Sequence, residues 1–85
     1  MTHQLKIWTG EFEAVADGRK THEVRVNDRG FAVGDALVLR EWIPIGNDLK
    51  EGSYTHRSAL RYVTYITPAG AWGLPGNICV LSIQP

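Results

Sequence analysis

The chain has 85 residues, and its nine basic and nine acidic side chains give a formal net charge of zero at pH 7. This length predicts a single domain, residues 1–85, with one small core. A neutral chain is a poor candidate for a non-specific binder of duplex nucleic acid, which needs many cations to displace counterions from phosphates, whereas a pocket for one nucleotide needs only about two or three.

A short strand and a short helix are predicted at the start of the chain. Residues 3–8 mix polar and apolar side chains and are read as the strand. Thr9 is predicted to be the N-cap, because its hydroxyl can accept a hydrogen bond from a free backbone N–H. Phe12 and Val15 share one apolar helix face, and Gly18 suits the left-handed residue that ends a helix. The helix has about two turns and needs packing to persist.

The rest of the chain is predicted to form short strands with turns between them. One strand is expected to end at Val26, and four more are expected over residues 36–42, 54–56, 60–67 and 78–83. The expected turns and loops cover residues 27–30, 46–52 and 68–76. Pro44 is expected to end its strand or to confine it to a sheet edge. Several short strands separated by turn signals predict a small β-barrel, whose closure would protect the strand edges.

The most informative segment runs from Gly18 to Arg25 and reads Gly-Arg-Lys-Thr-His-Glu-Val-Arg. Successive strand side chains point to opposite faces of a sheet. One face of this strand therefore carries Thr21, Glu23 and Arg25, and the other carries His22, Val24 and Val26. The two valines predict that the second face meets the core, which leaves Thr21 and Glu23 outside the apolar core.

Charged side chains gather at the start of this strand. The ammonium group of Lys20 suits a phosphate or a polarised carbonyl, although a lysine here also suits a solvated role next to helix carbonyls. Glu23 and Arg25 are close enough to pair, and an arginine held by a carboxylate presents its remaining donors to a phosphate or a base edge. An ion pair on the surface, worth about 0–1 kcal/mol, is the competing interpretation.

The pattern Gly-x-Lys-Thr-x-Glu-x-Arg resembles the signature of ASCH domains, a branch of the PUA-like superfamily. Here it consists of Gly18, Lys20, Thr21, Glu23 and Arg25. The resemblance implies a mainly β (α+β) fold, namely a small PUA-like/ASCH β-barrel with one short helix near a cleft. It also suggests RNA or a nucleotide as the ligand.

A second block extends this resemblance. Val33-Gly34-Asp35 precedes an apolar strand, as a Gly-Asp turn often does in PUA-like domains. The likeness runs from Leu5 to Ile83 and looks closest to small phage and bacterial ASCH-like proteins of unknown function.

Some ASCH-like proteins are amidohydrolases that deacylate a modified cytidine. In that branch a lysine acts with a nucleophilic threonine two residues before the arginine of the motif, and with a glutamate further on. Glu23 occupies the position of the threonine, and Thr21 lies about 6–7 Å away along a strand. A hydroxyl nucleophile needs a base within hydrogen-bond reach. Glu41 and Glu51 match the third member only by residue type, so amidohydrolase activity is the alternative function and we expect no turnover.

The remaining candidates for chemistry are aromatic or sulfur-containing. Trp8, Trp42 and Trp72 are candidates either for the core or for stacking on bases. The three histidines lack a metal-ligand spacing, so no metal site is expected. Cys79 lies in an apolar run and is expected to be a buried, inert thiol, and a single cysteine excludes an internal disulfide.

We therefore predict binding of RNA or a modified nucleotide in a cleft beside the short helix. The expected ligand-binding residues are Lys20, Thr21, Glu23, Arg25 and Trp8, with Glu23 orienting Arg25 or accepting from a base amine. No cofactor is expected, and no apolar run approaches the length of about 20 residues that a membrane helix needs. The N-terminus lacks a signal-peptide pattern, so the cytoplasm is the expected compartment. A protein-interaction module without nucleic acid is a third alternative.

Overall fold

The structure is a computed structural model that describes the backbone of residues 1–85 and the side chains of residues 1–47 and 50–85. The elements in chain order are β1 (Thr2–Trp8), α1 (Thr9–Ala16), β2 (His22–Val26), β3 (Ala36–Ile45), β4 (Asp48–Thr67), the 3-10 helix η1 (Ala71–Gly73) and β5 (Ile78–Gln84). The predicted mainly β class with one short helix is therefore confirmed. Among the described residues, no helix has the length and apolar composition needed to span a bilayer.

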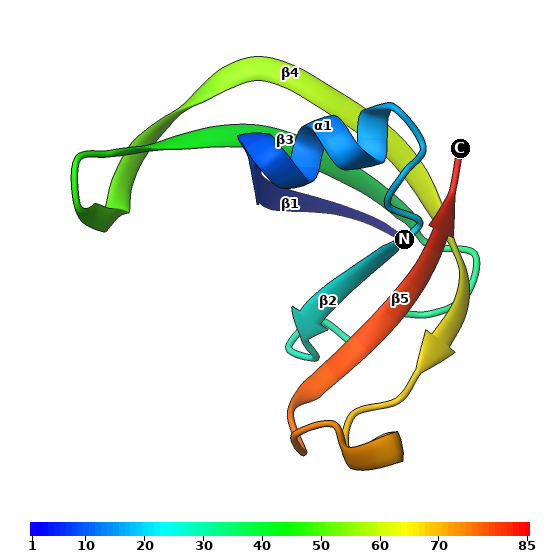
Figure 1. Cartoon of the computed structure of the whole chain (residues 1–85). Helices are drawn as coiled ribbons and strands as arrows, with labels where there is room; N and C mark the ends of the chain where they lie inside the picture. Colours follow the sequence, from blue (N-terminus) through cyan, green and yellow to red (C-terminus); the bar gives the residue numbers. More distant parts are fainter.

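The five strands form one mixed sheet in the order β1-β3-β4-β5-β2. β1 runs parallel to β3, and the other neighbouring pairs are antiparallel. The sheet curls strongly around α1 (Figure 1). It is not closed into a barrel, because the edge strands β1 and β2 each pair with only one neighbour in the described chain.

Two arginine side chains cross the gap between the edge strands. Arg25 Nη2 donates to the carbonyl oxygen of Lys6 at 2.7 Å, and Arg29 Nη1 donates to that of Gln4 at 2.9 Å. These carbonyls belong to the unpaired edge of β1, where a closed barrel would supply a neighbouring strand. We call this gap, bridged by Arg25 and Arg29, the seam.

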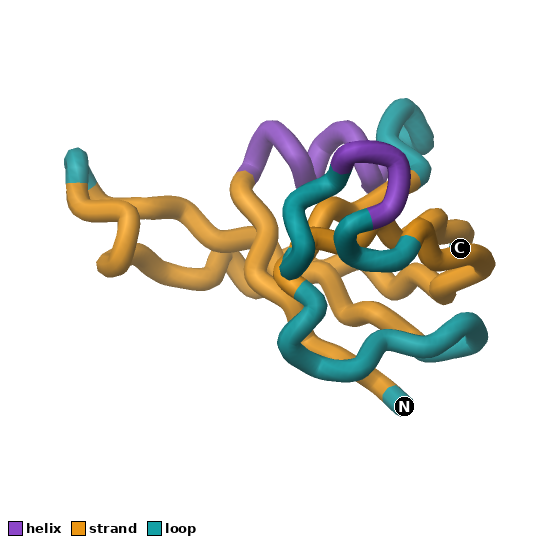
Figure 2. The backbone as a smooth tube through the Cα atoms, turned by 90° about the horizontal axis from the view of Figure 1, so that it is seen from below, coloured by secondary structure: helices purple, strands orange, loops and turns teal.

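The core lies inside the curl, where α1 packs on the concave face of the sheet (Figures 1 and 2). Its buried residues are Leu5, Ile7, Phe12, Val15, Leu37, Leu39, Ala59, Val63, Cys79, Leu81 and Ile83. The helix contributes the predicted pair, Phe12 and Val15. Burying a large apolar side chain contributes about 1.5–3 kcal/mol, which stabilises a helix too short to persist alone.

The structure confirms the predicted C-terminal end of α1 but not its predicted N-cap. Gly18 has φ +86° and its N–H donates to the carbonyl oxygen of Val15 at 3.2 Å, so the predicted helix stop is confirmed. The predicted N-cap is wrong by one residue, because Trp8 is the N-cap and makes no side-chain capping bond. Thr9 is the first helical residue, and its side chain hydrogen-bonds with Glu41 instead.

The predicted orientation of β2 is wrong. Val24 and Val26 are 52% and 47% exposed, whereas Glu23 is only 3% exposed. The cause is the register with β5, in which Glu23 lies opposite the buried Leu81. Residues opposite each other share a face, so Glu23 points inward and the valines point outward. Ion-pair partners, described below, make this burial of a carboxylate tolerable.

The β3–β4 hairpin extends beyond the sheet as an arm, residues 43–53 (Figures 1 and 2). Its turn covers only residues 46 and 47, so most of the loop predicted over residues 46–52 is strand. The side chains of residues 48 and 49 lie outside the described residues. Pro44 follows the end of the β1–β3 ladder, where β3 is an edge, as predicted.

A bulge interrupts the β3–β4 ladder next to the arm. One residue separates Arg40 from Trp42 on β3, but residues 55–57 separate their partners on β4. His56 has φ +72°, a left-handed conformation that is uncommon outside glycine. The predicted strands over residues 54–56 and 60–67 are therefore parts of one bulged strand.

Candidate functional site

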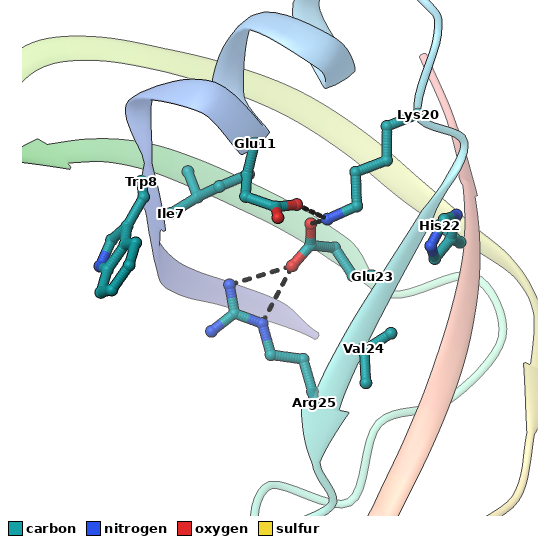
Figure 3. Close-up of a pocket in the computed structure, with 8 residues that line it drawn as sticks. All are labelled: Ile7, Trp8, Glu11, Lys20, His22, Glu23, Val24 and Arg25. Carbon is teal, nitrogen blue, oxygen red and sulfur yellow. Dashed lines mark hydrogen bonds and ion pairs between the residues drawn. The ribbon is translucent and has the colours of Figure 1, made fainter.

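A pocket of about 290 Å³ opens between the start of α1, the end of β1 and the strand β2 (Figure 3). Four of the five predicted ligand-binding residues line it: Lys20, Glu23, Arg25 and Trp8. Thr21 does not, because it precedes β2 and its side chain is exposed. We call this the seam pocket.

Four charged side chains form a line of alternating sign through the seam pocket (Figure 3). Lys20 Nζ pairs with the carboxylate of Glu11 and donates to Glu23 Oε1 at 2.9 Å. Arg25 Nε donates to Glu23 Oε2 at 3.1 Å. Each oxygen of Glu23 therefore has a cationic partner, and the four charges sum to zero.

Exposure differs along this line of charges. The Glu23 side chain is 4% exposed, Lys20 is 17% exposed and Arg25 is 24% exposed. Glu11 is 55% exposed and lies at the opening of the pocket. Glu23 is therefore a fixed anchor, and Glu11 is the member that solvent or a ligand reaches first.

The reversal of the chain after α1 brings Lys20 to this position. The backbone N–H of Lys20 donates to the carbonyl oxygen of Ala14 at 2.9 Å, so the chain turns back along the helix. This fold-back places Lys20 beside Glu11, nine positions earlier. Alternation along β2 then directs Glu23 and Arg25 to the same side.

The charges on both sides of Lys20 fix its protonation state. Burial alone would lower the pKa of Lys20, but hydrogen bonds from Lys20 to Glu11 and Glu23 outweigh burial and raise it. The hydrogen bond with Lys20, followed by its positive charge, lowers the pKa of Glu11. Lys20 is therefore an ammonium group at neutral pH, suited to holding an anion and unsuited to acting as a general base.

The amidohydrolase constellation is not assembled in the seam pocket. None of the described residues that line the pocket carries a hydroxyl or a thiol. Glu41 belongs to a separate network, and Glu51 is exposed on the arm. What the pocket offers is a binding surface with two cations, two carboxylates and the indole of Trp8 at its rim, 47% exposed.

Four lining residues were not predicted: Ile7, Glu11, His22 and Val24. Glu11 is an acid in the first turn of a helix, where the helix dipole alone explains it. Its contact with Lys20 depends on the fold-back after Gly18. Figure 3 shows that His22 and Val24 point to the opposite side of β2 from Glu23, so they border the pocket without joining the line of charges.

A second buried carboxylate lies on the other side of α1. Glu41 is 2% exposed and accepts from Arg57 Nε at 2.8 Å, from Arg57 Nη2 at 2.9 Å and from the Thr55 hydroxyl at 2.6 Å. The bonds from Arg57 and then from Thr55 hold the pKa of Glu41 at about 2, below its ordinary 4.5. Thr55 and Arg57 both lie in the bulge of β4, so the bulge positions both of these hydrogen-bond donors of Glu41.

The two buried carboxyls with depressed pKa values predict loss of stability in acid. Asp35 behaves like Glu41, because hydrogen bonds from His3 and from the Ala32 backbone lower its pKa from 3.8 to about 2. Between these values the unfolded chain binds more protons than the folded chain, so lowering the pH favours unfolding. We expect the free energy of unfolding to fall as the pH drops from about 4.5 to about 2.

Urea titrations across this pH range measure the effect. Glu41→Gln removes one of the two titrating groups, so its stability should depend less steeply on pH than that of the wild type. Equal slopes for the two proteins would contradict the assignment of acid sensitivity to Glu41.

Two other expectations concern cysteine and metals. Cys79 is buried, as predicted, and burial raises the pKa of its thiol. Within the part of the chain that the structure describes, no group of three or more histidine, cysteine, aspartate or glutamate side chains is placed to hold a metal ion.

Comparisons with known proteins give one family and one phage relative. A family model described as "Domain of unknown function (DUF3850)" matches residues 2–83. An "Uncharacterized 12.9 kDa protein in GpA 3'region" of Escherichia phage P2 is 31% identical over 70 residues, which are 82% of this chain. The match spans 58% of the length of the phage protein. Neither description states an activity.

Proposed function

We propose that this chain, which belongs to the DUF3850 family, binds a nucleotide unit, either free or within RNA, in the seam pocket. The convergence of Lys20, Glu23 and Arg25 in one concave pocket, with Trp8 at its rim, carries the proposal. The resemblance to ASCH domains supports it from the sequence, and a PUA-like origin of the curled sheet is part of the proposal. The cytoplasm is the proposed compartment.

Arg25 supplies the directional donors. Its Nε and Nη2 are held by Glu23 and by the carbonyl of Lys6. Among the described residues, no hydrogen bond uses Arg25 Nη1, so its two N–H groups are available to a phosphate oxygen or a base edge. A guanidinium held by two partners binds with little further loss of conformational freedom.

Glu23 and Trp8 complete the recognition of a nucleotide. Glu23 Oε1 accepts from Lys20 and keeps a second lone pair, to which a base amine can donate. The exposed indole of Trp8 gives a base a stacking surface, worth about 1–3 kcal/mol in single-strand binders.

Glu11 competes with an anionic ligand for Lys20. Its carboxylate pairs with Lys20 at the mouth of the pocket, and more than half of the side chain is exposed. An incoming phosphate replaces this carboxylate and keeps the ammonium neutralised. Affinity for phosphate therefore depends on how readily Glu11 turns toward solvent.

Titration calorimetry with cytidine and adenosine monophosphates, and with the matching nucleosides, tests the proposal. Lys20→Ala should weaken binding of the monophosphates about tenfold or more, since a charge-assisted hydrogen bond is worth about 1.5–3 kcal/mol. Glu11→Gln should strengthen it, because the competing charge is gone. For a short single-stranded RNA held by about two cationic contacts, the slope of log affinity against log salt should be roughly −1 to −2.

Arg19→Ala is the matched control, because Arg19 is an exposed cation that pairs with Asp17 outside the pocket. Absence of binding below millimolar concentration, or equal affinity in Lys20→Ala and the wild type, would refute the proposal. Deacylation of an N4-acylated cytidine that disappears in Lys20→Ala would instead make the protein an enzyme.

A further inference from the structure

The outer face of the sheet presents cations together with aromatic rings. Burial alternates along β1, so its outward side chains are those of Gln4, Lys6 and Trp8. The register places Lys6 beside Arg40 and Trp8 beside Trp42 on β3. Further across, the outward residues of β4 include Tyr54 and Tyr62, which are 36% and 42% exposed. We call Lys6, Trp8, Arg40, Tyr54 and Tyr62 the outer face.

Among the residues whose side chains are described, aromatic rings and not carboxylates hold the two cations of this face. Lys6 Nζ lies 4.1 Å from the centre of the Trp42 ring, and Arg40 Cζ lies 3.8 Å from that of Tyr54. Arg40 Nη1 also lies 3.4 Å from the neutral amide oxygen of Gln4. A ring attracts a cation without neutralising it, so both cations keep their full charge.

The acidic side chains of the described residues lie elsewhere. They lie on or next to α1, inside the curled sheet, in the β2–β3 connection and on the arm. The chain is neutral as a whole, yet the outer face carries two positive charges with no described carboxylate among them. A polyanion is the complementary partner for such a surface.

A second cavity, of about 330 Å³, lies on this face. Arg40, Tyr54 and the bulge residue His56 line it, together with Gln4 and Ser58. The positive φ of His56 is a strained conformation for a residue with a side chain. The bulge thus brings His56 to the same hollow as the half-buried Arg40, and no acidic residue lines this hollow.

We propose that the outer face binds a single-stranded nucleic acid. Lys6 and Arg40 contact phosphates, bases stack on Tyr62 and Trp8, and Tyr54 holds the Arg40 guanidinium in place. Interleaved cations and exposed aromatic rings match the two repeating parts of a single strand, its backbone charge and its bases. An acidic peptide would use the cations but leave the rings without a role.

Trp8 connects this surface to the seam pocket. It lines the pocket and also belongs to the outer row of β1. A strand with one nucleotide in the pocket therefore continues past Trp8 toward Lys6 and Arg40. Only this continuity rests on the proposed function of the pocket; the binding of a strand to the outer face stands without it.

The test uses fluorescence anisotropy with labelled single-stranded RNA and DNA of about ten nucleotides, within the range that small β domains cover. The variants are Lys6→Met and Arg40→Gln, singly and together, because methionine keeps an apolar stem over Trp42. Arg19→Gln is the control for loss of an exposed cation. Thermal unfolding by circular dichroism confirms that each variant is folded.

We expect the double variant to bind the oligonucleotide about tenfold or more weakly, with a salt slope smaller by about 1.4. Its affinity for cytidine monophosphate, and the oligonucleotide affinity of Arg19→Gln, should stay at the wild-type value. Tyr62→Ala should weaken oligonucleotide binding about fivefold or more through lost stacking.

Four outcomes separate the two proposals. Oligonucleotide binding that falls in the double variant while monophosphates do not bind would support the outer face and refute the pocket. Unchanged oligonucleotide binding in the double variant would overturn the outer face, as would absence of oligonucleotide binding in the wild type. Equal competition by polyglutamate would assign the face to acidic polypeptides and overturn the proposal.

Discussion

Gly52→Ala is expected to lower the free energy of unfolding by about 3 kcal/mol, the upper end of the usual range for an overpacked site. A Cβ atom at Gly52 would lie 2.2 Å from the carbonyl oxygen of Ile43 and 2.5 Å from a ring carbon of Trp42. The carbonyl belongs to the hairpin, and the ring is 4% exposed with the Lys6 ammonium over it. Neither group can retreat without disturbing its neighbours.

Urea denaturation measures this change, and Gly10→Ala is its matched control. A Cβ at Gly10 meets no atom within 4 Å, and the residue lies in α1. Alanine is favoured over glycine in a helix by about 0.5–1 kcal/mol, so the control should be slightly more stable than the wild type. A Gly52→Ala protein with the wild-type midpoint would show that both the Ile43 carbonyl and the Trp42 ring move aside without cost, and would contradict the prediction.

Glu23→Ala should have the second largest effect, a loss of about 2 kcal/mol in the free energy of unfolding. Removing one partner of a fully buried ion pair costs about 3–5 kcal/mol, because the other charge stays buried and uncompensated. Lys20 and Arg25 are 17% and 24% exposed, so water reaches part of each charge and reduces the cost. The same change should weaken nucleotide binding, since both cations lose their anchor.

Chemical denaturation of Glu23→Ala beside Glu51→Ala measures this effect. Glu51 is an exposed glutamate on the arm, where a substitution should change stability by no more than about 0.5 kcal/mol. A Glu23→Ala protein as stable as Glu51→Ala would mean that the buried carboxylate contributes nothing net. Glu23→Gln, which keeps the shape and the acceptor oxygen, should lie between the two.

The sequence predicts that Glu23 and Arg25 lie together, but it does not predict that their face of β2 is the buried one. Alternation places Glu23 and Arg25 on one side of a strand whichever side is buried, so their convergence was predictable. The prediction that Val24 and Val26 face the core was wrong, because β-branched residues favour an edge strand whether or not their side chains are buried. Burial of Glu23 depends on Lys20 and on the register with β5, which local sequence does not encode.

The contact of Glu11 and the network around Glu41 were beyond a sequence-based prediction for the same reason. Glu11 meets Lys20 only because the chain folds back after Gly18, and no spacing rule links residues nine apart. Glu41 gains its partners from a bulge, which needs the strand pairing to be known. The helix was accessible because its apolar spacing and its terminal glycine are local signals.

The seam differs from the other strand boundaries of the curled sheet in the bonds that cross it. Neighbouring strands elsewhere in the sheet are joined by backbone ladders. Among the described residues, the seam is bridged instead by side-chain bonds to β1 from Arg25 on β2 and from Arg29, which follows β2. Arg25 both bridges the seam and lines the seam pocket, so a ligand that drew its guanidinium away from the Lys6 carbonyl would leave the Arg29–Gln4 bond as the remaining described bridge.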